Sequence, residues 1–437
     1  MEEYIKKLLE QVRFEKAHKA ISDEIRSHIE DQIADNIYDG MDEETAEKMA
    51  VEEMGDPVDA GISLDKIHRP QIAWGIVAAA VVVALLGSSV RIFMSHDEIL
   101  QGYYDVLDKK IFIICTVLGI GLMLLLYFID FTTVAKYSRA AGRVLLASIV
   151  IANISKMPML MTVTDALKVL MVPLYAGIIY KYKDKRYEGF VKALIWIAVT
   201  VAVLIVDDGK MAVFAITIGM LLQLTIAINK RWIRVPEKPV YISMWSIFVL
   251  FLTYYIYNTR NYSRNITELA SGRTLDLTDV KTREFVITSK MVGTTSAHPI
   301  PWVPGNASVM TYILGRMGIF AGIAIAVIVT GLIIIGFVAV FKTKNQLGLV
   351  MGSGCMMWLA ANTIVDTLIG FGIFPDFGDS TFLPFISGCT GHYKDLIAAY
   401  AMLGILLSIY RFKNAYPEHV EIRFSSLFRK LELRKLK

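Results

Sequence analysis

Long apolar runs alternate with short charged segments along most of the chain. The runs recur from Gln71 to the neighbourhood of Arg411, and each has roughly the 17 to 25 residues that cross a hydrocarbon core of about 30 Å as a helix. We predict ten spans, at about 71–93, 110–131, 142–155, 165–181, 190–206, 211–229, 239–257, 309–341, 346–373 and 384–410. The pattern therefore predicts an all-α, polytopic membrane domain over residues 69–413.

The composition supports a membrane protein and argues against an ordinary soluble enzyme. The chain has 437 residues, of which 55% are hydrophobic, and its mean hydropathy is +0.50. So much apolar surface needs lipid around it. The formal net charge of +4 is explained by basic loops, and no nucleic-acid partner is expected. Cys115, Cys355 and Cys389 are too scattered to predict a disulfide framework or a metal site.

The short loops alternate in charge, and this alternation predicts the orientation of the chain. Lysine and arginine follow the second, fourth, sixth and eighth spans, whereas the intervening loops are poor in both. Because basic loops stay on the cytoplasmic side, ten spans place both termini in the cytoplasm and the long segment 258–308 outside. The basic residues concerned are Lys136, Arg139, Arg143, Lys181, Lys183, Lys185, Arg186, Lys230, Arg231, Arg234, Lys238, Lys342 and Lys344. Residues 414–437 form a basic cytoplasmic tail in this prediction.

Residues 1–68 differ from the rest of the chain because they are rich in charge and carry apolar residues at helical spacing. They are predicted to form a small soluble helical domain. The segments 24–30, 40–46 and 54–57, the last reading MGDP, resemble the permease prefix domain that precedes some bacterial membrane proteins. Asp42 is expected to cap the helix that follows it. The resemblance implies a role in protein interaction or assembly.

The most informative motif is LPFIS at 383–387, followed by an apolar run that ends in LLSI at 406–409. Both phrases resemble the last transmembrane helix of the SEDS family (shape, elongation, division and sporulation), which includes FtsW-, RodA- and SpoVE-like proteins. The resemblance implies a glycosyltransferase of the bacterial cytoplasmic membrane that polymerises the undecaprenyl-pyrophosphate-linked peptidoglycan precursor, lipid II. It also implies a class B penicillin-binding protein, or another wall-synthesis protein, as a partner.

Other motifs can be compared with the family one at a time. The segment 163–168 keeps an acid and a lysine, Asp165 and Lys168, where the family has PSE-x-x-K, and this spacing puts both on one helix face. Asp208 aligns with the family's QPD motif. The resemblance assigns further substrate-binding roles to residues of the long loop and the signature: Arg260, Arg264, Ser387, His392 and Lys394.

The long loop 258–308 is where the family carries its catalytic carboxylate. Counting back from Ser289 aligns Asp279 with that residue to within one position, and Asp276 is the alternate. A carboxylate serves as general base when it takes a proton from the attacking sugar hydroxyl. Cations stabilise the charge that develops on the pyrophosphate leaving group. The loop supplies candidates in Arg260, Arg264, Lys281, Arg283 and Lys290.

The chain departs from the family pattern at several places, and a second function stays open. Neither Asp276 nor Asp279 precedes a proline, and two acidic positions that the family has before the eighth span are lost near Val309 and Gly315. The alternative is a non-catalytic protein that uses the SEDS scaffold to transport a lipid substrate or to assemble wall-synthesis complexes. No metal ligands are predicted, although a divalent cation is compatible with the chemistry. Lys394 is considered as a partner for Asp366, in the ninth span.

Overall fold

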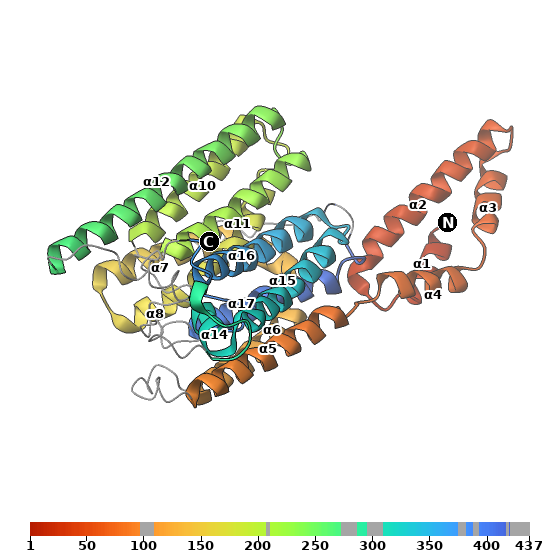
Figure 1. Ribbon diagram of the computed structural model, residues 1–437. Coiled ribbons are helices and arrows are strands. Elements are labelled where there is room, and N and C mark those ends of the chain that lie inside the picture. The colour runs from red at the N-terminus through yellow and green to blue at the C-terminus, as the bar shows by residue number, and fades with distance from the viewer. Residues whose placement is uncertain are drawn as a thin grey trace.

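The computed structural model describes residues 1–96, 109–206, 210–271, 286–294, 309–374, 382–387, 393–416 and 419. Four helices extend from one end of a larger helical bundle (Figure 1). These four are α1 (Glu2–Glu10), α2 (Glu15–Tyr38), α3 (Glu43–Glu53) and α4 (Pro57–His68). We call the end of the bundle nearest to them the proximal end and the opposite end the distal end.

Helices α1 to α4 share a small apolar core of their own. Its buried members lie on α1, α2, α3 and the α1–α2 connection: Tyr4, Leu8, Val12, Ala17, Ile21, Ile29 and Ala50. Asp42 caps α3, as predicted, because its carboxylate accepts a hydrogen bond of 3.1 Å from the Thr45 backbone N–H. Asp56 caps α4 in the same way, and Pro57 occupies the first helical position.

The bundle confirms the predicted all-helical polytopic membrane fold. Among the described residues, eight helical segments are long and apolar enough to cross a membrane: Trp74–Ser95, Lys109–Phe128, Pro158–Tyr180, Tyr187–Ile205, Met211–Asn229, Ile319–Phe341, Gln346–Gly370 and Tyr393–Arg411. The helices involved are α5 (Trp74–Ser95), α6 (Lys109–Phe128), α8 (Pro158–Leu167) with η2 (Lys168–Leu170) and α9 (Met171–Tyr180), α10 (Tyr187–Val206), α11 (Lys210–Asn229), α15 (Ile319–Phe341), α16 (Gln346–Gly370) and α17 (Tyr393–Arg411).

The other two predicted spans correspond to α7 (Phe131–Ser155) and α12 (Glu237–Ser271). Helix α7 is 25 residues long, and its first half carries Lys136, Arg139 and Arg143. These basic residues were predicted in a loop, but residues 129–130 suffice to turn the chain, and α7 begins at Phe131 rather than at 142. Helix α12 has 35 residues, or about 52 Å at 1.5 Å per residue, so it is longer than a hydrocarbon core.

Three predicted spans are interrupted in the structure. The fourth span begins at Pro158 rather than at 165. It tightens to the 3-10 helix η2 one turn before Pro173, because proline lacks the N–H that would bond to the Val169 carbonyl. The eighth span is two helices, α14 (Val309–Met317) and α15, separated by Gly318 at φ 96°. The tenth begins as a non-helical turn, Phe382 to Ser387, and the helix α17 starts only at Tyr393.

Helix α17 lies along α6 through the middle of the bundle. Close approach is possible because each helix has a glycine at the contact. A Cβ at Gly119 would lie 2.5 Å from the Tyr400 ring, and one at Gly404 would lie 2.8 Å from the Met123 carbonyl oxygen. The proximal end of α17 continues into residues 412–416, which lie beside the linker to α5, where the Gln71 N–H donates to the Arg411 carbonyl at 3.2 Å.

The N-terminal helices contact the proximal end of the bundle. We call the contact formed by Phe14, Lys16, Asp130, Phe412 and Tyr416 the proximal junction, and the Asn414 side chain also donates to the Ile67 carbonyl of α4 at 3.3 Å. Asp130 caps α7 and also accepts hydrogen bonds from Lys16 Nζ, at 2.6 Å, and from the Tyr416 hydroxyl. The Phe14 and Phe412 ring centroids are 5.5 Å apart. Asp130 thus connects three parts of the chain.

Candidate functional site

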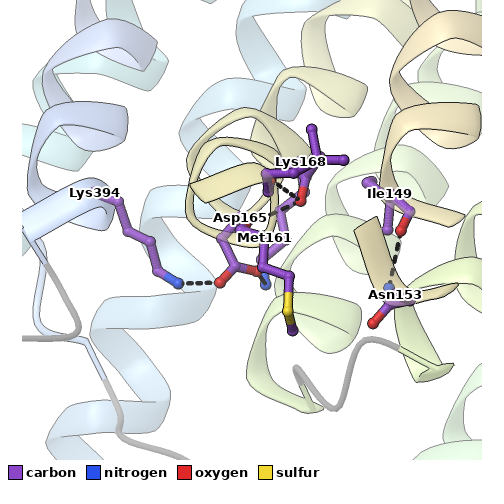
Figure 2. A network of polar contacts seen from close by, with 8 residues as sticks. Ile149, Asn153, Met161, Asp165, Lys168 and Lys394 are labelled. Carbon is purple, nitrogen blue, oxygen red and sulfur yellow. Dashed lines mark hydrogen bonds and ion pairs between the residues drawn. The ribbon is translucent and has the colours of Figure 1, made fainter. Parts of the chain in front are cut away.

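The break in the fourth span places two charged side chains inside the bundle. Asp165 lies in the last turn of α8, and Lys168 begins η2. As the spacing predicted, Lys168 Nζ donates to Asp165 Oδ1 at 2.9 Å. Lys394, from the first turn of α17, reaches the other carboxylate oxygen at 2.5 Å (Figure 2). We call Asp165, Lys168 and Lys394 the distal cluster.

The distal cluster is largely shielded from water by the protein. The Lys168 side chain is 11% exposed, and the Asp165 and Lys394 side chains are each 25% exposed. One carboxylate and two ammonium groups leave a net charge of +1 within a helical bundle. Charged groups at such depth face a bundle interior or a water-filled cavity and mark functional sites. The arrangement is suited to an anion, because charge-assisted hydrogen bonds from ammonium groups are stronger than neutral ones.

The LPFIS motif, residues 383–387, forms a buried turn that precedes Lys394 in the chain. The Ser387 hydroxyl accepts a hydrogen bond of 2.9 Å from the Leu383 N–H, and its residue is almost fully buried. Phe385 adopts a positive φ of 70°, and its ring meets that of Tyr400 at 5.1 Å between centroids. A Cβ at Gly87 of α5 would lie only 2.2 Å from the Phe385 carbonyl oxygen. The motif therefore packs against α5 just before α17 begins.

The other predicted site residues fall into two groups. Arg260 and Arg264 lie on the distal part of α12, which corrects their placement in a loop, and Lys290 lies in the segment 286–294 with its side chain exposed. The remaining ones lie outside the described residues: Asp208, Asp276, Asp279, Lys281, Arg283 and His392. Their roles stay predictions.

The ion-pair partner of Lys394 differs from the predicted one. Lys394 pairs with Asp165, whereas the sequence suggested Asp366, which is fully buried in α16. In the part of the chain that the structure describes, no three His, Cys, Asp or Glu residues gather in a way that would hold a metal ion. No ligand set for a divalent cation is therefore assigned.

Arg91, in the distal half of α5, is not among the residues predicted from the sequence. Its side chain is buried, with the residue 1% exposed, and its guanidinium lies 5.7 Å from the centroid of the Phe112 ring. It follows Gly87 by one helical turn and so lies close to the LPFIS turn. Arg91 is the single charge in the apolar run 71–93. An ionisable residue inside a predicted span is a recognisable signal that could have found it.

Comparison with known proteins relates the fold to structures of cell-wall proteins. No family profile and no curated protein matches this sequence. A structure described as "Structural coordination of polymerization and crosslinking by a peptidoglycan synthase complex" matches with a TM-score of 0.58 at 15% identity, covering 79% of this chain and 98% of that one. The rod shape determining protein RodA of Thermus thermophilus matches with a TM-score of 0.51 at 12% identity, covering 78% and 97%. A single-substitution mutant of the same RodA gives a TM-score of 0.53 at 12% identity, covering 78% and 98%. The protein thus has a RodA-like fold.

Proposed function

We propose that this protein is a SEDS-like peptidoglycan glycosyltransferase that polymerises lipid II, the undecaprenyl-pyrophosphate-linked disaccharide precursor. The observation that carries the proposal is the distal cluster, which two helices assemble at an interrupted span in a RodA-like bundle. A net positive site within the membrane region suits a substrate whose lipid tail stays in the bilayer and whose pyrophosphate carries the charge.

The chemistry divides between the cluster and the long loop. As the bond between the donor's anomeric carbon and the pyrophosphate breaks, negative charge grows on the phosphate oxygens, and nearby cations stabilise it. Lys168 and Lys394 are suited to that task. Asp165 is poorly suited to be the general base, because an ammonium group bonds to each of its oxygens. We therefore assign removal of the acceptor hydroxyl proton to Asp279, with Asp276 as the alternate.

The proposal includes a membrane, an orientation and a partner. The protein would lie in the bacterial cytoplasmic membrane with its proximal end in the cytoplasm and its distal cluster toward the external face, and both termini would be cytoplasmic. The distal end of α12, with Arg260 and Arg264, would then extend beyond the bilayer near the loop that contains Asp279. A class B penicillin-binding protein is the expected partner, since a matching structure is titled as a complex that coordinates polymerization and crosslinking.

One observation favours the second candidate, a non-catalytic scaffold or lipid transporter. Helix α14 is buried at the distal end, and its sequence VMTYILGRM contains Arg316 but no acid where the family has acidic positions. A site that retains phosphate-binding cations but lacks those acidic positions could hold a lipid pyrophosphate without transferring it.

The decisive experiment is polymerisation of lipid II by the purified protein, with and without a candidate class B penicillin-binding protein. Asp279→Asn removes the base and nearly preserves shape, so turnover should fall by about a hundred- to ten-thousand-fold while the protein stays folded. Asp276→Asn is the matched control and should do less. If Asp279→Asn kept more than about a tenth of the activity, Asp279 would be excluded as the base. A wild-type protein that binds lipid II without polymerising it would favour the scaffold.

A further inference from the structure

A short segment of the long loop returns to the bundle and is fixed at its distal end. Residues 286–294, which we call the distal lip, pair with the connection between α14 and α15. The N–H groups of Ile319 and Phe320 donate to the carbonyls of Lys290 and Met291 at 3.1 and 3.2 Å, and the Gly293 N–H donates to the Met317 carbonyl at 3.3 Å. Gly318 makes this possible, because a Cβ there would lie 2.7 Å from the Met291 carbonyl oxygen.

The distal lip presents large apolar side chains outward. Ile287 is 76% exposed, Val292 is 73% exposed and Met291 is 61% exposed, whereas Ser289 between them is buried. Three such side chains within six residues form an amphipathic segment. Contiguous exposed apolar surface of this kind marks a contact with a membrane or a partner.

The apolar surface of the lip is continuous with the lipid-facing surface of α15. Met291 is hydrogen-bonded through its backbone to Phe320, the second residue of α15, whose side chain is 60% exposed. The exposed apolar residues continue along that helix through Ile323 and Val327. Since α15 is one of the membrane spans and begins at Ile319, the lip lies level with the end of a span, where a bilayer changes from acyl chains to headgroups.

We propose that the distal lip is a membrane anchor whose Ile287, Met291 and Val292 side chains insert into the interfacial region of the adjacent leaflet. Lys290 lies beside them and is exposed, so its aliphatic stem can add to the apolar contact. Amphipathic segments with this composition lie in the plane of a membrane interface.

The anchor has a consequence for the loop that precedes it. Asp279 lies seven residues before Val286, so a fully extended chain of that length spans at most about 25 Å. A lip fixed in the interface would keep this carboxylate within that distance of the membrane surface. The proposal itself concerns lipid contact and does not depend on glycosyltransferase activity.

The test is site-directed spin labelling of the whole protein in lipid nanodiscs, with the three native cysteines replaced by alanine. Ile287→Cys and Val292→Cys would each carry the label. Val327→Cys, 63% exposed in the middle of α15, is the lipid control, and Tyr38→Cys, 91% exposed on α2, is the aqueous control. We expect labels on the lip to collide with dissolved oxygen more often than the Tyr38 label does, though less often than the Val327 label in the bilayer interior. We also expect them to collide severalfold less with a water-soluble nickel chelate than the Tyr38 label does.

A second measurement avoids the cysteine replacements. A photoreactive benzophenone amino acid at Ile287 or Val292 should form adducts with nanodisc lipids, detected by mass spectrometry, as the same amino acid does at Val327. Labels as accessible to the nickel chelate as that at Tyr38, or an absence of lipid adducts, would overturn the proposal. Adducts to a co-purified protein in place of lipid would overturn it as well, and would show that the lip is a protein interface.

Discussion

Asp165 connects two lysines that come from parts of the chain more than two hundred residues apart. Neither lysine would be stable at this depth without a nearby anion, because a buried charge costs several kcal/mol unless it is paired. The carboxylate therefore serves two purposes at once. It allows the bundle to contain two ammonium groups, and it fixes their positions relative to each other.

The first prediction follows from that pairing. Asp165→Asn removes the anion to which both lysines donate, so the protein should lose about 1–3 kcal/mol of stability, below the 3–5 kcal/mol of a fully buried pair because these groups are partly exposed. Thermal unfolding in detergent measures the change. Asp184→Asn is the control, since Asp184 pairs with Arg234 at 3.0 Å on the surface, and such pairs contribute at most about 1 kcal/mol. Equal effects of the two substitutions would show that the distal cluster is not a structural unit.

At the scale of elements, the junction between α14 and α15 determines how the distal lip is held. Gly318 has φ 96° and ψ 165°, a backbone conformation that is open essentially to glycine alone. The position also has no room for a side chain, because the lip backbone lies against it. Conformation and space therefore both require glycine at this position.

The second prediction tests this element. Gly318→Ala should destabilise the protein by about 1–3 kcal/mol and loosen the lip. Gly331→Ala is the matched control on α15, because a Cβ there meets nothing within 4 Å and alanine is favoured over glycine in a helix by about 0.5–1 kcal/mol. Thermal unfolding should move in opposite directions for the two variants. A neutral Gly318→Ala would contradict the proposed packing of the lip.

The elements also show where sequence reasoning succeeds and where it fails. Apolar length predicted a span at each of the eight described helical segments that are long and apolar enough to cross a membrane, because a crossing imposes a minimum run of about twenty residues. It could not locate the breaks at Lys168, Gly318 and Phe385, since a membrane helix and a buried turn have the same apolar composition. The Asp165–Lys168 pair was predictable because its spacing is local. Its third member, Lys394, depends on how α17 packs beside α8, and no local pattern records such a contact.

At the scale of the whole molecule, α17 connects two regions that sequence reasoning treated separately. Its first turn supplies Lys394 to the distal cluster, and its last residue leads into Phe412 and Tyr416 of the proximal junction. The N-terminal helices are therefore fastened to the same helix that enters the candidate site. This contact indicates that the N-terminal helices have a fixed orientation relative to the bundle, rather than being attached to it only by a linker.

The third prediction concerns the pH dependence of that attachment. Burial raises the pKa of Asp130, but hydrogen bonds from Lys16, Tyr416 and Thr132 outweigh it, so the pKa lies below its usual value. A carboxylate with a lowered pKa stabilises the folded contact above the unfolded pKa of about 3.9, and this contribution is lost as the pH falls through the folded value. Photocrosslinking from a benzophenone amino acid at Phe14 to the segment 412–416 should therefore stay efficient from neutral pH to about pH 4 and decline below it, where the carboxylate becomes protonated.

Asp130→Asn provides the companion variant for this measurement. It removes the charge that attracts Lys16, whose side chain is half exposed, so a loss of about 1 kcal/mol and an approximately fivefold lower ratio of docked to undocked protein are expected at neutral pH. Crosslinking in the variant should no longer depend on pH in the acid range. Unchanged crosslinking in Asp130→Asn would show that the Asp130 carboxylate does not stabilise the attachment.

The last prediction concerns orientation, which the fold alone leaves open because a bundle can be inserted either way. The proximal turns contain Lys183, Lys185, Arg231 and Lys342, and short loops rich in lysine and arginine stay in the cytoplasm. A cysteine at Ser271, at the distal end of α12, should therefore react with an impermeant thiol reagent in intact cells, whereas one at Lys183 should react only after the cells are opened. The reverse pattern would place the distal cluster on the cytoplasmic side, where an external glycan polymerase could not use it, and the proposed function would fail with the topology.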